Sequence, residues 1–283
     1  MVKSLIINSS HYIGNSTFRY PLRTPMKCPD DVSHISIVSC SIYNNTFNIS
    51  SLYGNNTLSL NWLGTTYNLT FLNGYYAASD INSYIQSYCY TNGLYMTTST
   101  GNIVYFIECV VNAVRYAISL NLYYIPTSAN ATTLSYSIPS GSSWTFPTTN
   151  STPQVTFNTV FGSLIGQIAG TYPPTVLTTN IQYVSTTTPI ISPVNAYVIC
   201  VNILNNPYSN PNNILFTLPL NNSFGGLVTS TPMLVWNEIY SGQYSEFTLT
   251  IFDQNMNILS LNDNEIVIQL AFSKLDPKTG YIS

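Results

Sequence analysis

Charge is what this sequence most lacks. Asp, Glu, Lys and Arg make up 6% of its 283 residues, against about 25% in an ordinary soluble domain. The seven basic residues are scattered, without a cluster that could neutralise a row of phosphates, so no specific nucleic-acid binding is expected. Surface charge normally keeps soluble proteins apart, and we therefore infer that partner subunits cover much of this surface. An AT-rich genome would explain the excess of Asn, Ile and Tyr equally well.

Long apolar runs and paired cysteines are missing too. No uninterrupted apolar run approaches the roughly 20 residues that cross a bilayer, so no membrane span is predicted. Residues 1–16 hold one Lys and a very short apolar run, unlike a signal peptide. The five cysteines stand at unrelated spacings without a CxxC pair, which predicts reduced and mostly buried thiols. They are Cys28, Cys40, Cys89, Cys109 and Cys200.

Residue types that carry catalysis are few. The only histidines are His11 and His34, and His34 occupies an alternating strand position rather than a recognisable motif. Glu108 lies in the apolar run "IVYFIECVV", where a charge needs a partner, and Arg115 is the expected one. There is no GxSxG elbow and no calcium-loop pattern after the acids at 30–31. We expect no enzyme: no catalytic residue, no cofactor and no metal site.

The stretch "FNTVFGSLIGQIAGTYPPT", residues 157–175, holds three glycines four residues apart. It lacks the spacing and the Lys of a phosphate-binding loop. Pro173 and Pro174 would end any membrane helix within a turn of Gly170. Its apolar residues recur at helical spacing. A short packed helix is therefore predicted, beginning at Asn158 and stopped by Gly170 and Pro173.

Period-two alternation dominates the rest of the chain. In "SEFTLTIFD", Phe247, Leu249 and Ile251 should point one way and the residues between them the other. Strand candidates are 4–8, 17–22, 33–43, 57–63, 66–72, 103–110, 114–125, 176–183, 196–203, 214–218, 234–239, 245–253 and 265–272. One clear helix is expected over 79–93. These patterns favour an all-β sandwich or barrel, with more strands than an eight-stranded unit needs.

One connector stands out. The Ser/Thr/Pro-rich segment 127–154 has little periodicity and is predicted to be a crossing loop. Trp144 and Phe146 within it are expected to anchor the loop to the body of the protein. No clean domain boundary is visible in the sequence.

The block "SSHYIGNSTFRYPLRTPMKCPDDVSHISIVSCSIYNNTFNIS" lies near the start of the chain. It resembles the N-terminal pair of strands in the penton, or minor capsid, proteins of virophages and of related Polinton-like and large double-stranded DNA viruses. Further blocks follow in the same order and extend to about residue 272. They are "NGYYAASDINSYIQSYCYTNG", "GNIVYFIECVVNAVRYAISLN", "FNTVFGSLIGQIAGTYPPT", "NNPYSNPNNILFTL" and "YSEFTLTIFDQNMNIL".

The resemblance implies a single jelly-roll β-sandwich with an inserted small subdomain, within about 57–155, and one or two short helices. It implies a homopentamer at the five-fold vertex of an icosahedral virion, assembled in the host cytoplasm. Neighbouring capsomers of a double-jelly-roll major capsid protein would be its partners. The family resemblance supplies no catalytic residue.

Two other function classes stay open. In a carbohydrate-binding or attachment module, exposed aromatic rings would stack on sugars, and the candidates are Trp144, Phe146, Tyr75 and Tyr76. A glycosidase on the same scaffold would need two facing carboxylates roughly 5–10 Å apart. The attachment role and the vertex role are compatible with each other.

Overall fold

The structure, a computed structural model, describes residues 2–274, and it divides into two compact units. Of the described residues, 2–46 and 194–274 form one of them, here called the sandwich unit. Residues Phe47–Pro193 form the other, the inserted unit, which extends beyond both ends of the range 57–155. Among the described residues, no helix is long and apolar enough to cross a membrane.

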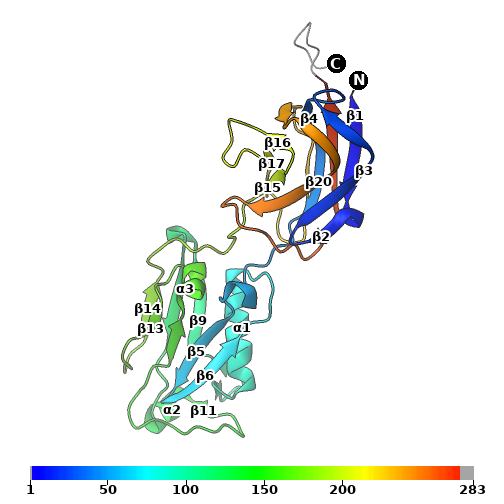
Figure 1. The fold of residues 1–283 in the computed structure, drawn as a ribbon. Coiled ribbons are helices and arrows are strands. Elements are labelled where there is room, and N and C mark those ends of the chain that lie inside the picture. The colour runs from blue at the N-terminus through cyan, green and yellow to red at the C-terminus, as the bar shows by residue number, and fades with distance from the viewer. Residues whose placement is uncertain (1, 275–283) are drawn as a thin grey trace. The chain divides into compact units, whose positions relative to one another are not determined.

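The sandwich unit contains two antiparallel sheets (Figure 1). The first has the order β1 (Lys3–Asn8), β21 (Ile266–Ser273), β4 (His34–Tyr43), β19 (Asn237–Ile239) and β16 (Leu204–Asn205), with β18 (Leu227–Ser230) also paired to β4. The second has the order β17 (Ile214–Pro219), β15 (Ala196–Val201), β20 (Gly242–Asp253), β3 (Thr17–Cys28) and β2 (Tyr12–Gly14). The 3-10 turn η1 (Ser9–His11) joins β1 to β2.

The pairing of these strands is nested. The first long strand pairs with the last, β1 with β21, and the next one inward pairs with the next, β3 with β20. Further in, β4 pairs with β18 and β19, and β15 pairs with β17. Successive strands that wrap in this way over two facing sheets form a jelly roll. The fold class expected from the sequence, an all-β jelly roll with an insertion, is confirmed.

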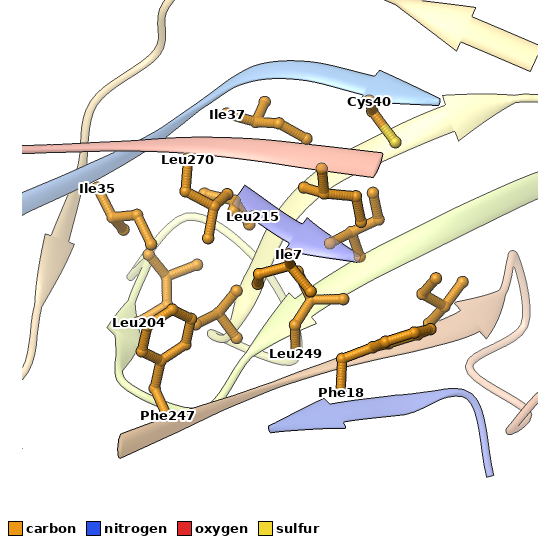
Figure 2. Packing of buried hydrophobic residues seen from close by; sticks show 14 of the residues in the cluster. Ile7, Phe18, Ile35, Ile37, Cys40, Leu204, Leu215, Phe247, Leu249 and Leu270 are labelled. Atoms are coloured by element: carbon orange, nitrogen blue, oxygen red, sulfur yellow. The ribbon is translucent and has the colours of Figure 1, made fainter. Parts of the chain in front are cut away.

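The core of the sandwich unit lies between the two sheets (Figure 2). Phe247, Leu249 and Ile251 are all fully buried, which confirms the alternation seen in the sequence. Phe18 and Leu270 reach the same core from β3 and β21, one from each sheet. Because both sheets contribute large apolar side chains, this unit has a hydrophobic core of its own.

The inserted unit has a second, separate core and three small antiparallel sheets. One sheet runs β13 (Gly170–Tyr172), β12 (Gln154–Phe157), β5 (Thr57–Trp62), β6 (Thr65–Thr70). Another runs β14 (Ile181–Val184), β10 (Ala117–Leu122), β9 (Ile107–Asn112). The third runs β11 (Tyr136–Ser137), β7 (Met96–Thr98), β8 (Ile103–Val104). The short 3-10 turns are η2 (Ser51–Tyr53) and η3 (Ala113–Arg115).

Helix α1 (Ala78–Thr91) covers part of this core and closes two open sheet edges. The hydroxyls of Tyr84 and Tyr88 donate to backbone carbonyls of β6, at 2.8 and 3.1 Å. The Asn82 side chain accepts the backbone N–H of Cys109 in β9, at 2.8 Å. These polar side chains satisfy backbone groups that a sheet edge would otherwise leave unpaired. The helix begins at Ala78 and ends at Thr91, close to the range 79–93 that the sequence suggests.

The predicted crossing loop is not irregular throughout. Helix α2 (Ser128–Leu134) and strand β11 lie within 127–154, so the described residues contain three α-helices where one or two were expected. The Thr127 side chain caps α2 by accepting the backbone N–H of Asn130, at 3.3 Å. Threonine-capped helices of two turns show too little apolar periodicity to be recognised in a Ser/Thr-rich run.

The glycine-rich stretch forms the short packed helix α3 (Thr159–Ile165), capped by Asn158 as predicted. It ends earlier than expected, at Gly166, which adopts a left-handed conformation with φ +75°. The carbonyl of Gly166 accepts hydrogen bonds from the backbone N–H groups of Thr186 and Thr187. Gly166 is therefore a junction between α3 and a distant segment, and Gly170 belongs to β13.

Candidate interaction surfaces

The two aromatic residues of the segment 127–154 are anchors. The Trp144 indole N–H donates to the Gly93 carbonyl at 2.6 Å, and its ring packs edge-on against Trp62. Trp144 is 9% exposed, and Phe146 is half-buried against the same core. The anchoring predicted from the sequence is therefore present, and a ring held this way offers little face to a sugar.

Tyr75 and Tyr76 are half-buried in another part of the inserted unit. The Tyr75 hydroxyl shares a hydrogen bond with the Ser192 hydroxyl, at 2.8 Å. The Tyr76 hydroxyl donates to the Leu72 carbonyl at 3.0 Å, and its ring contacts Phe71 edge-on. Burial raises the pKa of the Tyr76 hydroxyl, so it stays protonated as a donor. Binding by any of the four candidate aromatics stays a prediction.

Glu108 does not pair with Arg115, contrary to the prediction. Its Oε2 accepts the hydroxyl of Tyr123 at 2.8 Å, and the ion pair found within residues 2–274 joins Arg19 to Glu246 at 3.9 Å. Arg115 lies at the exposed tip of the β9–β10 hairpin, because the strand turns through η3 before the next strand begins. Within the described part of the chain, no group of three or more His, Cys, Asp or Glu residues could hold a metal ion.

The cysteine thiols are buried and free, as predicted. Burial raises the pKa of the Cys40, Cys89 and Cys109 thiols to about 12, from an ordinary value of 9.0. These thiols therefore stay protonated in the folded protein at pH values where an unfolded chain ionises them.

Stability is expected to fall above pH 9 for this reason. A thiol with a raised folded pKa contributes stability below its unfolded pKa of about 9, and that stability is lost as pH rises toward 12. Urea unfolding at pH 7.5 and at pH 10 measures the decline, which should be smaller in Cys40→Ala. Thiol-reactive dye should label the native protein far more slowly than the urea-unfolded chain; equal rates would contradict the burial.

An apolar hollow of about 460 Å³ opens on the inserted unit, beside the β9–β10 hairpin. Val111, Tyr116, Ile118 and Ile190 line it, and Val114 at the hairpin tip is 98% exposed. The charged residues of this unit are only Asp80, Glu108 and Arg115. Its surface is therefore almost entirely neutral.

The sandwich unit carries two further features, on opposite edges of its sheets. A groove of about 400 Å³ lies along β1 and β3, and it is lined by both apolar and basic side chains. At the other edge, the segment 231–236 between β18 and β19 exposes Met233, Leu234 and Val235. The sequence suggests a strand over 234–239, but only Asn237–Ile239 pairs. The signal that distinguishes this segment from a strand is four successive apolar residues without alternation, 233–236, directly after Pro232.

No protein-family model matches the chain, and no curated protein matches it. Among solved structures it is similar to the mavirus penton protein, with 11% identity and a TM-score of 0.43, over 96% of this chain and 98% of that chain. It is also similar to a chain in the cryo-EM structure of the Sputnik virophage, with 14% identity and a TM-score of 0.38, over 96% and 97% of the two chains. Both similarities extend over nearly the whole chain.

Proposed function

We propose that this chain is a structural protein of a virus particle, and that five copies form a penton at each five-fold vertex. The nested jelly roll of the sandwich unit carries the proposal, because capsid proteins are a common use of that fold. The blocks of sequence that resemble penton proteins support it. The neighbouring partners would then be capsomers of the major capsid protein, and the protein would reside in the virion after assembly in the host cytoplasm.

The surface of the sandwich unit supports assembly as well. Clusters of exposed apolar side chains are unusual on the surface of a monomeric protein. Here Met233 and Val235 are 87% and 64% exposed, two residues apart in one segment. Protein interfaces are enriched in aromatic residues and Met and depleted in Lys and Glu, which matches a chain with 23 Tyr and 6% charged residues.

The purified protein is expected to form a discrete ring with five times the chain mass of 31.4 kDa. Size-exclusion chromatography with light scattering measures that mass, and negative-stain images show the rotational symmetry. Since a chain with so few charged residues can form few ion pairs between copies, the mass should be the same at about 0.1 M and about 1 M salt. A stable monomer at high concentration in capsid-assembly buffer would count decisively against a penton.

The attachment role remains the second candidate, and one observation now favours a different location for it. Tyr90, Tyr95 and Tyr105 form a row of neighbouring rings, with centroids 5.2 and 6.5 Å apart. Tyr90 is 53% exposed, in a unit with almost no charge. Such rings are better placed than Trp144 to stack on an uncharged sugar.

A further inference from the structure

The two edges of the sandwich unit differ in shape. The first flank consists of β1, β2 and β3, residues 3–28, and the second flank consists of β16 to β19, residues 204–239. The outermost strands of the first flank, β1 and β2, lie at one end of the two sheets, and β16 and β17 of the second flank lie at the other end (Figure 1). The two flanks meet where the Cys28 thiol at the end of β3 donates to the Ile239 carbonyl of β19, at 3.3 Å. The first flank is hollowed and the second projects, so one could receive the other.

The hollow of the first flank is the groove along β1 and β3. Its apolar lining consists of Leu5, Tyr20, Leu22, Met26 and Phe272. Of these, Met26 and Phe272 belong to the buried core, and the other three are half-buried side chains packed against it. The groove floor is therefore the rim of the hydrophobic core, left open between the two sheets.

The projection of the second flank is the segment 231–236. Both strands beside it, β18 and β19, pair with β4, but the segment itself pairs with nothing in the two sheets. Met233 is 87% exposed, Val235 is 64% exposed and Leu234 is 48% exposed. All three side chains are apolar, and the flexible Met233 can adapt to an irregular surface. They are small enough to enter a groove of about 400 Å³.

Charge on the two flanks is complementary. Residues 2–28 carry four basic side chains, Lys3, Arg19, Arg23 and Lys27, and no acidic one. Residues 203–241 carry one charge, the exposed Glu238. Arg19 is paired to Glu246, whereas Lys3 and Arg23 line the groove and form no ion pair within the described residues. Asp31 also lines the groove, where its carboxylate accepts the backbone N–H of Lys27 at 2.9 Å.

We infer that the segment 231–236 of one copy docks into the first-flank groove of the next copy. This inference rests on the ring proposed above and names the surfaces that close it. A contact between two different surfaces is heterologous, and repeated around an axis it produces a ring instead of a two-fold dimer. The apolar side chains of the segment would cover the open core rim, and the acid of the second flank would face unpaired Lys3 and Arg23.

The test blocks one flank at a time. Met233→Ser with Val235→Ser removes the large apolar side chains of the projecting segment without adding charge, and Lys3→Glu with Arg23→Glu reverses the groove's basic side chains. Each double variant should be a monomer by light scattering, with association weakened at least ~100-fold. Leu52→Ser, at a leucine that is 75% exposed in the inserted unit, is the matched control and should still form the ring.

Mixing the two double variants tests whether the contact joins two different surfaces, the segment of one copy and the groove of the next. Each retains one intact flank, so an equimolar mixture should form a heterodimer of two chain masses, which also shows that both variants are folded. If the wild type forms a ring and either double variant still does, this contact is wrong while the penton proposal stands. If the wild type is a monomer under all conditions, the penton proposal itself fails.

Discussion

Removal of the inserted unit is expected to leave a folded jelly roll. Replacing residues 47–193 by a six-residue Gly/Ser linker should give a sandwich unit that unfolds cooperatively, and the excised segment 47–193 should fold on its own. The physical reason is that each unit buries its own hydrophobic core, with no residue common to the two. Denaturant unfolding followed by circular dichroism should show each fragment reproducing one transition of the full chain.

The structure indicates why a short linker suffices. The hydroxyl of Tyr197, near the start of β15, donates to the carbonyl of Tyr43 at the end of β4, at 3.3 Å. One side chain therefore bridges the points where the chain leaves and re-enters the sandwich unit. Asn45 is held there as well, because its side chain donates to the Asp263 carbonyl at 2.7 Å. Six residues reach about 20 Å when extended.

A deletion with narrower boundaries is the matched control. Removing only 57–155, the range that sequence resemblance suggests, takes β5 and also the first two residues of its partner β12, Gln154 and Val155. It also divides the second core, so this version should aggregate or remain unfolded. If the 57–155 deletion folds as well as the 47–193 deletion, or if the sandwich unit alone is molten, the two cores are not independent.

Gly166→Ala is the single substitution with the largest expected cost. The added Cβ would lie 2.3 Å from the backbone carbonyl oxygen of Thr187 and 2.9 Å from the Ser185 side chain, and φ at this position is +75°. Strain in the left-handed region and overpacking together should cost roughly 2–5 kcal/mol. The lower free energy of unfolding should appear in the transition of the inserted unit. The backbone amide protons of Thr186 and Thr187, which donate to the Gly166 carbonyl, should exchange faster with solvent.

Gly64→Ala separates the two contributions. Gly64 has φ +89° in the turn between β5 and β6, but nothing lies within 4 Å of its added Cβ. This variant should therefore lose only the conformational part, roughly 1–2 kcal/mol. Equal losses for the two variants would show that the contact between Gly166 and the segment 185–189 is not close in solution.

The sequence predicts the long elements well because their periodicity is local. β4, β5, β20 and β21 lie within two or three residues of their expected ranges, and α1 and α3 are present where helical spacing indicates them. In β21 the residues Ile266, Ile268, Leu270 and Phe272 are all buried, as alternation requires. These elements each bury one face against a core, and a buried face is visible in a single chain.

The surfaces are less predictable because they depend on contacts far apart in the sequence. The partner of Glu108 is Tyr123 of the same sheet region and not Arg115, since η3 turns the arginine outward. Met233 is exposed because it lies in the unpaired segment between two short strands that pair with different parts of β4. β18 pairs with residues 40–43 of β4, and β19 pairs with residues 34–35. Trp144 is withdrawn from the surface by a hydrogen bond to Gly93, fifty-one positions away. Pattern alone contains none of these pairings.

The scarcity of ionisable groups in the inserted unit has a consequence for how it meets other molecules. Its only Asp, Glu, Lys or Arg residues are Asp80, Glu108 and Arg115, so the unit carries a formal charge close to zero. Because the unit has so little charge, it does not attract a binding partner electrostatically over long distances. The rate of association is then set by diffusion, and the specificity by the fit of the two surfaces. The affinity of any molecule that binds this unit should therefore be nearly independent of salt concentration.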